Sequence, residues 1–271
     1  MKMKILGTVA PYCKNGKYCP GYLIQTEKEK VLLDCGNGIT NLLDMEKDLE
    51  NMTIIISHLH PDHYGDILSL ADTIDLYHKF GFLSNKVKLY LPKTKKEKIK
   101  EPCKDKDGWA TTRIVEKPII EEQLIKNIGK NHYFDLEEYD ENWKLKIGKF
   151  NISFCKTLHP IDTYAVKIKD NTGTIVYSAD TGYEDKNLVE FAKMADIFLC
   201  ESSFLKGQVR DNNYHLYAYE AAKIAKKAQV NQLVLTHFWP EIDKNKYLEE
   251  AKEIFSNTEV AIENKVYKLT K

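Results

Sequence analysis

Short runs of apolar and β-branched residues, each bounded by turn residues, recur along most of the chain. Runs of about four to eight such residues are typical of β-strands. They predict strands at Lys4–Val9, Gly21–Gln25, Lys30–Asp34, Met52–Ser57, Val87–Leu91, Lys144–Ile147, Phe150–Thr157, Thr163–Lys169, Thr174–Ser178, Ile197–Glu201 and Leu233–Thr236.

Longer segments, in which apolar residues recur at intervals of three and four, lie between groups of these strands. This spacing predicts helices at Gly38–Glu50, Asn187–Ala195, Leu216–Ala228 and Lys244–Phe255. Because strands occur in groups with helices between the groups, we expect sheets packed on one another with helices on their outer faces.

One stretch departs from this pattern. From Lys93 to Lys106 the chain carries seven lysines against three acidic residues, a mixed helical segment is expected next, and an acidic patch follows at Asp135–Glu141. We interpret residues 93–140 as a charged insertion in a single domain that spans residues 1–271. Such a stretch is usually a solvated surface excursion, and the alternative is a lid or an anion-attracting rim beside an active site.

Composition adds few constraints. Lysine plus arginine equals aspartate plus glutamate at 40 each, so net charge gives no sign of a nucleic-acid partner or an anionic membrane. No run approaches 18 apolar residues, and no cleavage site follows the short N-terminal apolar run, so we expect a cytoplasmic protein with no membrane partner. The six cysteines include no CxxC pair, which favours reduced thiols.

Four potential metal ligands lie directly after the strand expected at Met52–Ser57. His58 and His60 are alternate residues, so they can point the same way and bind one metal ion. Asp62 and His63 follow a proline turn and can reach a second ion. A surface loop that happens to carry histidines is the alternative, but it does not explain this spacing. Histidine nitrogens and carboxylate oxygens suit zinc, manganese or iron.

Further candidate ligands also stand just past predicted strands. These are His159, Asp180 and His237. Asp180 is the natural bridge between two cations, because a carboxylate has two oxygens and a negative charge.

Supporting roles are predicted for three more residues. Asp34 either orients a ligand histidine or caps a turn. Glu201 and Ser202 end a strand near Asp180, where they can support the same site.

Seven motifs, taken in order, resemble the metallo-β-lactamase superfamily and, within it, the branch of ribonuclease Z-like enzymes and phosphodiesterases. They are ILGTVAPY, LLDCGNG, SHLHPDH, TLHP, SADTG, HLYAYEAAKIAKKA and LTHFWP, and they span nearly the whole chain. The resemblance implies an α+β fold, a four-layer αββα sandwich of two mixed sheets with helices outside. It also implies two divalent metal ions, with Zn²⁺ favoured and Mn²⁺ or Fe as alternatives.

Carried over by position, the resemblance assigns every candidate. It implies that His58, His60 and His159 hold one ion, that Asp62, His63 and His237 hold the other, and that Asp180 bridges them. His215 matches a histidine that lies by the scissile phosphate and is not a ligand. Asp62 and His215 are therefore the expected catalytic residues, as proton acceptor and proton donor.

Two departures weigh against transfer-RNA processing. Ribonuclease Z enzymes commonly carry a protruding arm between the positions that match His159 and Asp180, where this chain has only twenty residues. They also tend to have a glutamate three residues before that aspartate, where this chain has Tyr177.

The function that fits best is a phosphodiesterase of a small nucleotide-like or other phosphoester, with a nucleic-acid substrate disfavoured. Hydrolysis of a lactone, thioester or amide is the first alternative, because one fold supports many chemistries. An RNA-processing nuclease and a non-enzymatic metal-binding protein are the others. The resemblance leaves a homodimer open, because relatives often dimerise.

Overall fold

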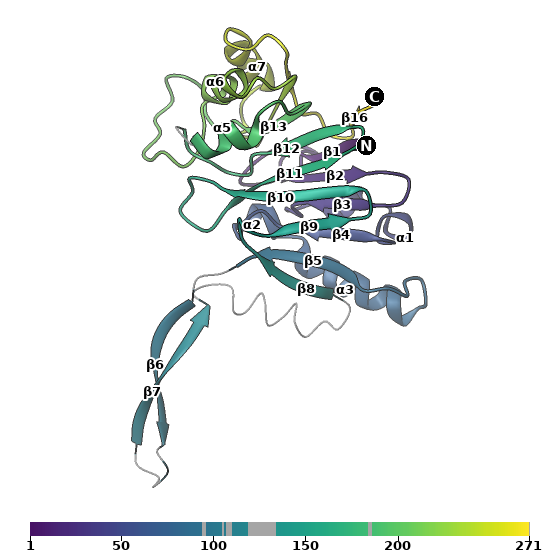
Figure 1. The fold of residues 1–271 in the computed structure, drawn as a ribbon, viewed down its shortest axis with the longest axis vertical. Coiled ribbons are helices and arrows are strands. Elements are labelled where there is room, and N and C mark those ends of the chain that lie inside the picture. Colours follow the sequence, from purple (N-terminus) through teal and green to yellow (C-terminus); the bar gives the residue numbers. More distant parts are fainter. Residues whose placement is uncertain (94–95, 105, 107–109, 119–133, 184–185, 271) are drawn as a thin grey trace.

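A computed structural model describes residues 1–93, 96–104, 106, 110–118, 134–183 and 186–270 of the 271-residue chain (Figure 1). Two mixed seven-stranded sheets form its body. The first has the order β16-β1-β2-β3-β4-β5-β8, with β1 Lys2–Gly7, β2 Gly21–Gln25, β3 Lys30–Leu33, β4 Met52–Ile55, β5 Val87–Pro92, β8 Phe134–Tyr139 and β16 Val266–Lys268. The second has the order β15-β14-β13-β12-β11-β10-β9, with β9 Lys144–Ile147, β10 Phe150–Lys156, β11 Tyr164–Asp170, β12 Gly173–Tyr177, β13 Ile197–Glu201, β14 Gln232–Thr236 and β15 Thr258–Val260.

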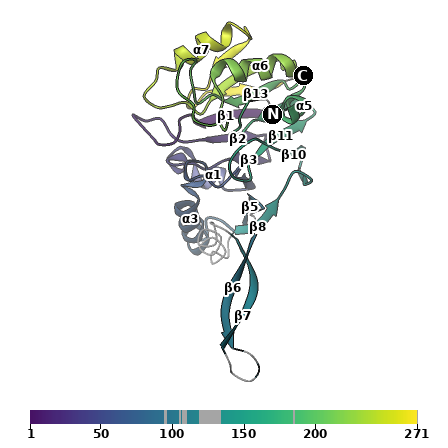
Figure 2. The same cartoon turned by 90° about the vertical axis from the view of Figure 1, so that its left-hand side faces the viewer.

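Helices cover the outer face of each sheet (Figures 1 and 2). The first sheet packs against α3, the 3-10 turn η1 and α1, and the second packs against α5, α6 and α7. Their bounds are η1 Ile39–Leu42, α1 Met45–Asp48, α3 Ile67–Lys79, α5 Lys186–Ala192, α6 Ala218–Ala228 and α7 Lys244–Lys252. The predicted αββα sandwich is confirmed.

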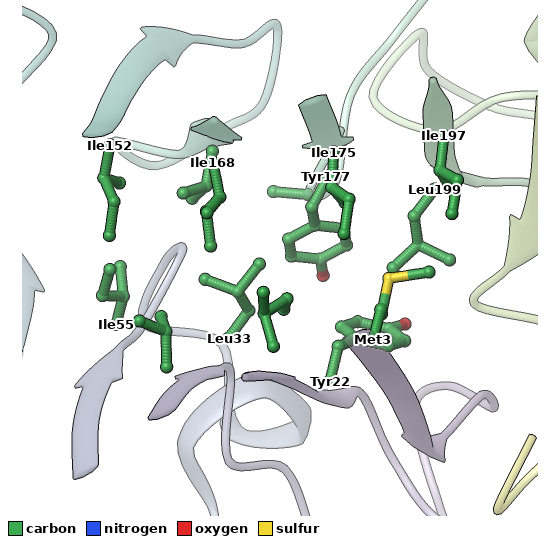
Figure 3. Packing of buried hydrophobic residues seen from close by; sticks show 14 of the residues in the cluster. Met3, Tyr22, Leu33, Ile55, Ile152, Ile168, Ile175, Tyr177, Ile197 and Leu199 are labelled. Carbon is green, nitrogen blue, oxygen red and sulfur yellow. The ribbon is translucent and has the colours of Figure 1, made fainter. Parts of the chain in front are cut away.

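The main core lies between the two sheets (Figure 3). Ile55 and Leu33 of the first sheet face Ile152 and Ile168 of the second, and all four are at most 2% exposed. The rings of Tyr22 and Tyr177 pack across the same interface at 4.9 Å. Burying this much apolar surface on both faces fixes the register of each strand, because a slip of one residue would turn its core side chains outward.

Parallel strands bring several strand ends to one edge of each sheet. In the first sheet β3 pairs with β4 in parallel, and in the second β12, β13 and β14 pair in parallel. Segments that follow these strands therefore emerge together. This explains how residues from five distant parts of the sequence can meet.

The single helix predicted at Gly38–Glu50 is wrong. The segment folds as η1 and the separate short helix α1, because Leu43 is extended at φ −88° and ψ 135°. Asp44 then caps the new helix by accepting a hydrogen bond from the backbone N–H of Lys47. Helix α3 was not predicted, although its buried residues Ile67, Leu70, Ala71 and Ile74 follow helical spacing.

The helical segment expected after Lys106 does not form at Ala110–Pro118, which is a strand, and the rest of that prediction falls on residues 107–109 and 119–133, outside the described residues. Strands β6 (Lys96–Lys104) and β7 (Ala110–Pro118) form an antiparallel hairpin that projects from the body (Figures 1 and 2). Its register places Lys98 opposite Glu116, so residue types of opposite charge occupy facing positions. Most of the acidic patch lies in strand β8.

The hairpin leaves the first sheet after β5, which lies parallel to β4. No described residue of the hairpin lines the cavity that opens at the cluster of candidate ligands. Its projection therefore favours the surface excursion over the lid for the described part of residues 93–140. Across the described ranges, no helix has the length and apolarity needed to cross a membrane. All six cysteines are free thiols.

Candidate metal centre

The loop that follows strand β4 carries four of the candidate ligands. All four residues of Met52–Ile55 are buried, which anchors the start of this loop. His58 and His60 lie in the segment after the strand, and Asp62 and His63 are the two buried residues of the single turn α2, Pro61–Tyr64. The four side chains fall into two adjoining groups, as their spacing predicted.

The first group consists of His58, His60, His159 and Asp180, whose ligand atoms all lie within 4.8 Å of one another. Nδ1 of His60 is 3.1 Å from Nε2 of His58 and 3.1 Å from Nε2 of His159. Oδ2 of Asp180 is 3.5 Å from Nε2 of His58. Three ring nitrogens and one carboxylate oxygen therefore converge, as in a four-coordinate zinc site.

The second group consists of Asp62, His63 and His237. Nε2 of His63 is 3.2 Å from Nε2 of His237, and Oδ2 of Asp62 is 3.6 Å from each of these nitrogens. Oδ1 of Asp180 completes the group, at 3.4 Å from His63 and 3.1 Å from His237.

Asp180 therefore presents one oxygen to each group, which is the geometry expected of a bridge. It stands three residues past β12, while His237 directly follows the parallel strand β14. Oδ1 of Asp180 is buried and has no hydrogen-bond partner among the described residues. A buried carboxylate oxygen left in this way is costly unless a cation binds it.

The protonation of the first group also fits a divalent cation. Burial lowers the pKa of His159 to about 4 and holds the pKa of His58 well below its usual value, so both imidazoles are neutral and offer lone pairs. Burial alone would raise the pKa of Asp62, but the neighbouring His63 and His237 outweigh it and keep this carboxyl ionised. Burial lowers the pKa of His63, but Asp180, Asp62 and Asp34 outweigh it and raise this pKa well above its usual value, so a cation bound there would displace a proton from the ring. The first group thus pairs neutral nitrogens with a carboxylate, a donor set that zinc, manganese and iron accept.

Asp34 orients one of these histidines, as predicted. It follows β3, is fully buried, and its Oδ2 lies 2.8 Å from Nδ1 of His63. The same oxygen accepts hydrogen bonds from the hydroxyls of Ser57 at 2.9 Å and Tyr177 at 2.8 Å. This network fixes the His63 ring with Nε2 toward the second group.

Two of the other histidines are also oriented by a hydrogen-bonding partner at the ring nitrogen that faces away from the first group. Nδ1 of His58 lies 3.0 Å from Oγ of Ser57, and Nδ1 of His159 lies 3.1 Å from the carbonyl oxygen of Tyr214. Each contact leaves the opposite ring nitrogen facing the first group, an arrangement typical of metal ligands.

His215 stands beside both groups without belonging to the predicted ligand sets. Its Nδ1 is 3.0 Å from Oε1 of Glu201 and 3.8 Å from Oδ2 of Asp180. Burial lowers the pKa of His215, but these two carboxylates outweigh it and raise the pKa to about 9. The imidazolium is therefore the stable form of His215 in this arrangement.

Glu201 and Ser202, the two supporting residues predicted at the end of strand β13, differ in their contacts with the site. Glu201 contacts the site through His215, but the hydroxyl of Ser202 donates to the backbone carbonyl of Thr236 at 3.1 Å. The residue that contacts the site is Ser203, which was not predicted. Its two-residue spacing from Glu201, which puts both side chains on one face of an extended segment, was the available signal.

A cavity of about 770 Å³ opens from the two groups. One end carries the polar residues His60, Asp62, Asp180, Ser203, His215 and His237, and the other walls are Ala10, Pro11, Pro61, Phe204, Gln208, Val209, Trp239 and Ile242. Trp239 is 44% exposed and packs edge-on against Tyr12 at 5.9 Å. A polar end joined to an apolar wall is typical of a small-molecule site.

This fold and site define a metallo-hydrolase with the metallo-β-lactamase fold, and the comparisons with known proteins agree. The chain is 31% identical over 264 residues to the probable metallo-hydrolase YhfI of Bacillus subtilis, covering 97% of this chain and 96% of that protein. The crystal structure of the metallo-β-lactamase-fold protein YhfI superimposes with a TM-score of 0.81 at 24% identity, covering 98% of this chain and 99% of that one.

Residues 1–260 match the family model described as anti-Pycsar protein Apyc1, so the chain belongs to that family. More distant structures share the fold. The short form of human tRNase Z superimposes with a TM-score of 0.71 at 18% identity over the full length of both chains. A diphosphatase from the PhnP family has a TM-score of 0.66 at 14% identity, covering 99% of this chain and 98% of that one.

Proposed function

We propose that this chain is a dinuclear, zinc-dependent phosphodiesterase that hydrolyses a small, nucleotide-like phosphoester. The residues that would hold the two ions are His58, His60, His159, Asp62, His63, His237 and the bridging Asp180. Two divalent cations bound by these residues would lower the pKa of water toward neutrality and stabilise the charge that develops on a phosphoryl group.

The observation that carries the proposal is the position of His215. The imidazole of His215 is held by Glu201 at the rim of the cavity, 3.8 Å from Asp180. Hydrolysis of a phosphodiester releases an alkoxide that needs a proton, and a positioned acid contributes roughly 10²–10⁴-fold to such a step. The carboxylate of Glu201 both orients His215 and keeps it charged.

The chain's own residues account for both proton transfers. Water attacks phosphorus in line with the leaving oxygen, and Asp62, which the second group keeps ionised, accepts the proton that this water loses. His215 donates its Nε2 proton to the leaving oxygen as the P–O bond breaks. Nδ1 of His215 stays on Oε1 of Glu201 throughout, so the ring keeps its orientation.

The cavity supports a substrate of modest size, and two of the structural relatives support a phosphoester. The apolar wall formed by Phe204, Val209, Trp239 and Ile242 can hold an organic group while the phosphoryl group lies among the polar residues. Those relatives are a tRNase and a diphosphatase by name, so both cleave bonds to phosphorus.

A nucleic acid is not the substrate we propose. The twenty residues between His159 and Asp180 are used by β11 and β12, which pair within the second sheet and leave no arm there. The projecting hairpin β6–β7 lies elsewhere in the sequence and lines no part of the cavity in its described residues.

The test is a substrate panel run on the zinc-loaded and the manganese-loaded protein. It contains bis(p-nitrophenyl) phosphate, thymidine 5′-p-nitrophenyl phosphate, a phosphomonoester, a lactone, a thioester and a short RNA. We expect turnover of the phosphodiesters. With metal content unchanged, His215→Ala should lower kcat by about 10²–10⁴-fold on a diester with an alkoxide leaving group, such as a dithymidine phosphate, and much less on the p-nitrophenyl esters, whose leaving group needs no proton. Turnover confined to the lactone or thioester, or a steeply salt-dependent cleavage of the RNA, would replace this proposal with one of those activities.

A further inference from the structure

One hydroxyl joins the second metal group to the His215–Glu201 pair. Oγ of Ser203 lies 2.9 Å from Oε2 of Glu201, 2.9 Å from Nδ1 of His237 and 3.4 Å from Nδ1 of His215. The backbone N–H of Ser203 also donates to Oε2 of Glu201, at 3.1 Å. Ser203 lines the cavity, so this contact lies within the site.

The hydroxyl has a single proton, and its neighbours determine where that proton goes. The carboxylate of Glu201 is fully buried and can only accept, so the hydroxyl of Ser203 donates to Oε2. The oxygen of Ser203 is then free to accept the Nδ1–H of His237. A neutral histidine has one N–H, so Nε2 of His237 keeps its lone pair.

That lone pair is on the side of the metal group. Nε2 of His237 lies 3.1 Å from Oδ1 of Asp180 and 3.6 Å from Oδ2 of Asp62. The opposite tautomer would direct a proton into this space and exclude a cation from it. The contact with Ser203 therefore determines whether His237 can act as a ligand.

The first sheet contains the same arrangement. The hydroxyl of Ser57 donates to Oδ2 of Asp34 at 2.9 Å, and its backbone N–H donates to Oδ1 of Asp34 at 2.6 Å. The oxygen of Ser57 lies 3.0 Å from Nδ1 of His58. Each sheet thus supplies a serine that holds a buried carboxylate by two bonds and faces Nδ1 of a predicted ligand.

We propose that Ser203 is a positioning residue: its hydroxyl, oriented by Glu201, holds His237 in the tautomer that presents Nε2 to a metal ion. One carboxylate thereby supports both a metal ligand and His215. The inference rests on the proposed metal centre, and it does not depend on which ester the protein hydrolyses.

The test is zinc affinity, measured on metal-free protein against a competing chelator. Removal of such a supporting contact costs about 10–100-fold in metal affinity, so we expect Ser203→Ala to bind one of the two ions that much more weakly. Ser203→Thr keeps the hydroxyl and restores the affinity. Ser202→Ala is the matched control, because the hydroxyl of Ser202 donates to the backbone carbonyl of Thr236. We expect this variant to bind both ions normally.

A measurement on the unaltered protein covers the case in which Ser203→Ala does not fold. Long-range ¹H–¹⁵N spectra of the histidine rings, recorded with and without zinc, are expected to show the proton of His237 on Nδ1. A proton on Nε2, or wild-type affinity for both ions in Ser203→Ala, overturns the inference, as does an equal loss in Ser203→Thr. If the wild-type protein binds no zinc at all, the proposed function fails together with this inference. The outcomes above overturn the inference alone, so the two failures can be distinguished.

Discussion

The phenolic oxygen of Tyr177, in the second sheet, donates a 2.8 Å hydrogen bond to Oδ2 of Asp34, which follows a strand of the first sheet. The same oxygen of Asp34 lies 2.8 Å from Nδ1 of His63. The packing of the two sheets is therefore coupled directly to the orientation of a predicted metal ligand. Tyr177 occupies the position where the sequence departs from the glutamate common in ribonuclease Z enzymes, and its hydroxyl has a structural partner there.

We expect Tyr177→Phe to destabilise the metal-free protein modestly. The change removes one hydrogen bond, whose net contribution is about 0.5–1.5 kcal/mol, with up to about 3 when the acceptor is charged. Asp34 keeps its bonds to Ser57 and His63. Urea unfolding of the metal-free variant measures the difference, and a stability equal to that of the wild type would show that the bond contributes nothing net.

Asp34→Asn is expected to weaken zinc binding by about 10–100-fold, because the amide cannot accept from all the donors around it. The backbone does not explain such a loss, since asparagine tolerates the left-handed φ of 58° found at this residue. Chelator competition measures the affinity. Asp72→Asn, on the exposed side of α3, is the control and should change nothing.

Zinc is expected to stabilise the fold, because the ligands come together only in the folded chain. An ion present at about 100 times its dissociation constant stabilises the native state by about 2.7 kcal/mol. Thermal unfolding with zinc and with excess EDTA gives the difference in Tm, and EDTA should also abolish hydrolysis. An unchanged Tm in the presence of EDTA would show that no ion contributes to stability.

Trp239→Ala should raise KM more than it lowers kcat. The ring lines the cavity, and the loss of an aromatic stacking partner costs about 1–3 kcal/mol. Steady-state kinetics on thymidine 5′-p-nitrophenyl phosphate measure both constants. Trp143→Ala is the control, because Trp143 is 39% exposed, close to the 44% of Trp239, and is not among the residues that line the cavity. Equal KM values for the two variants would exclude a substrate contact at Trp239.

The sequence predicted the sandwich and the convergence of the site for identifiable reasons. Strands such as Met52–Ile55 and Ile197–Glu201 are buried at every position, so a continuous apolar run marks them. Candidate ligands directly follow such runs, and parallel pairing brings the ends of these strands together. Short spacing among His58, His60 and His63 indicated the shared loop.

Other features depend on contacts that local patterns do not encode. The hairpin β6–β7 is held by cross-strand pairing, and its charged sequence has no clear period of two. The break at Leu43 depends on one extended residue and a new helix cap. The helical spacing of apolar residues continues across this break, so the spacing alone predicts one helix. Ser203 acquires its place from contacts with Glu201 and His237, the latter 34 residues away.

Anomalous diffraction from a crystal of the zinc-loaded protein tests the metal centre most directly. We expect two zinc peaks about 3.5–4 Å apart with Asp180 between them. One peak should lie among the side chains of His58, His60 and His159, and the other among Asp62, His63 and His237. A zinc ion held by other residues, or no anomalous peak in either group, would contradict the dinuclear centre.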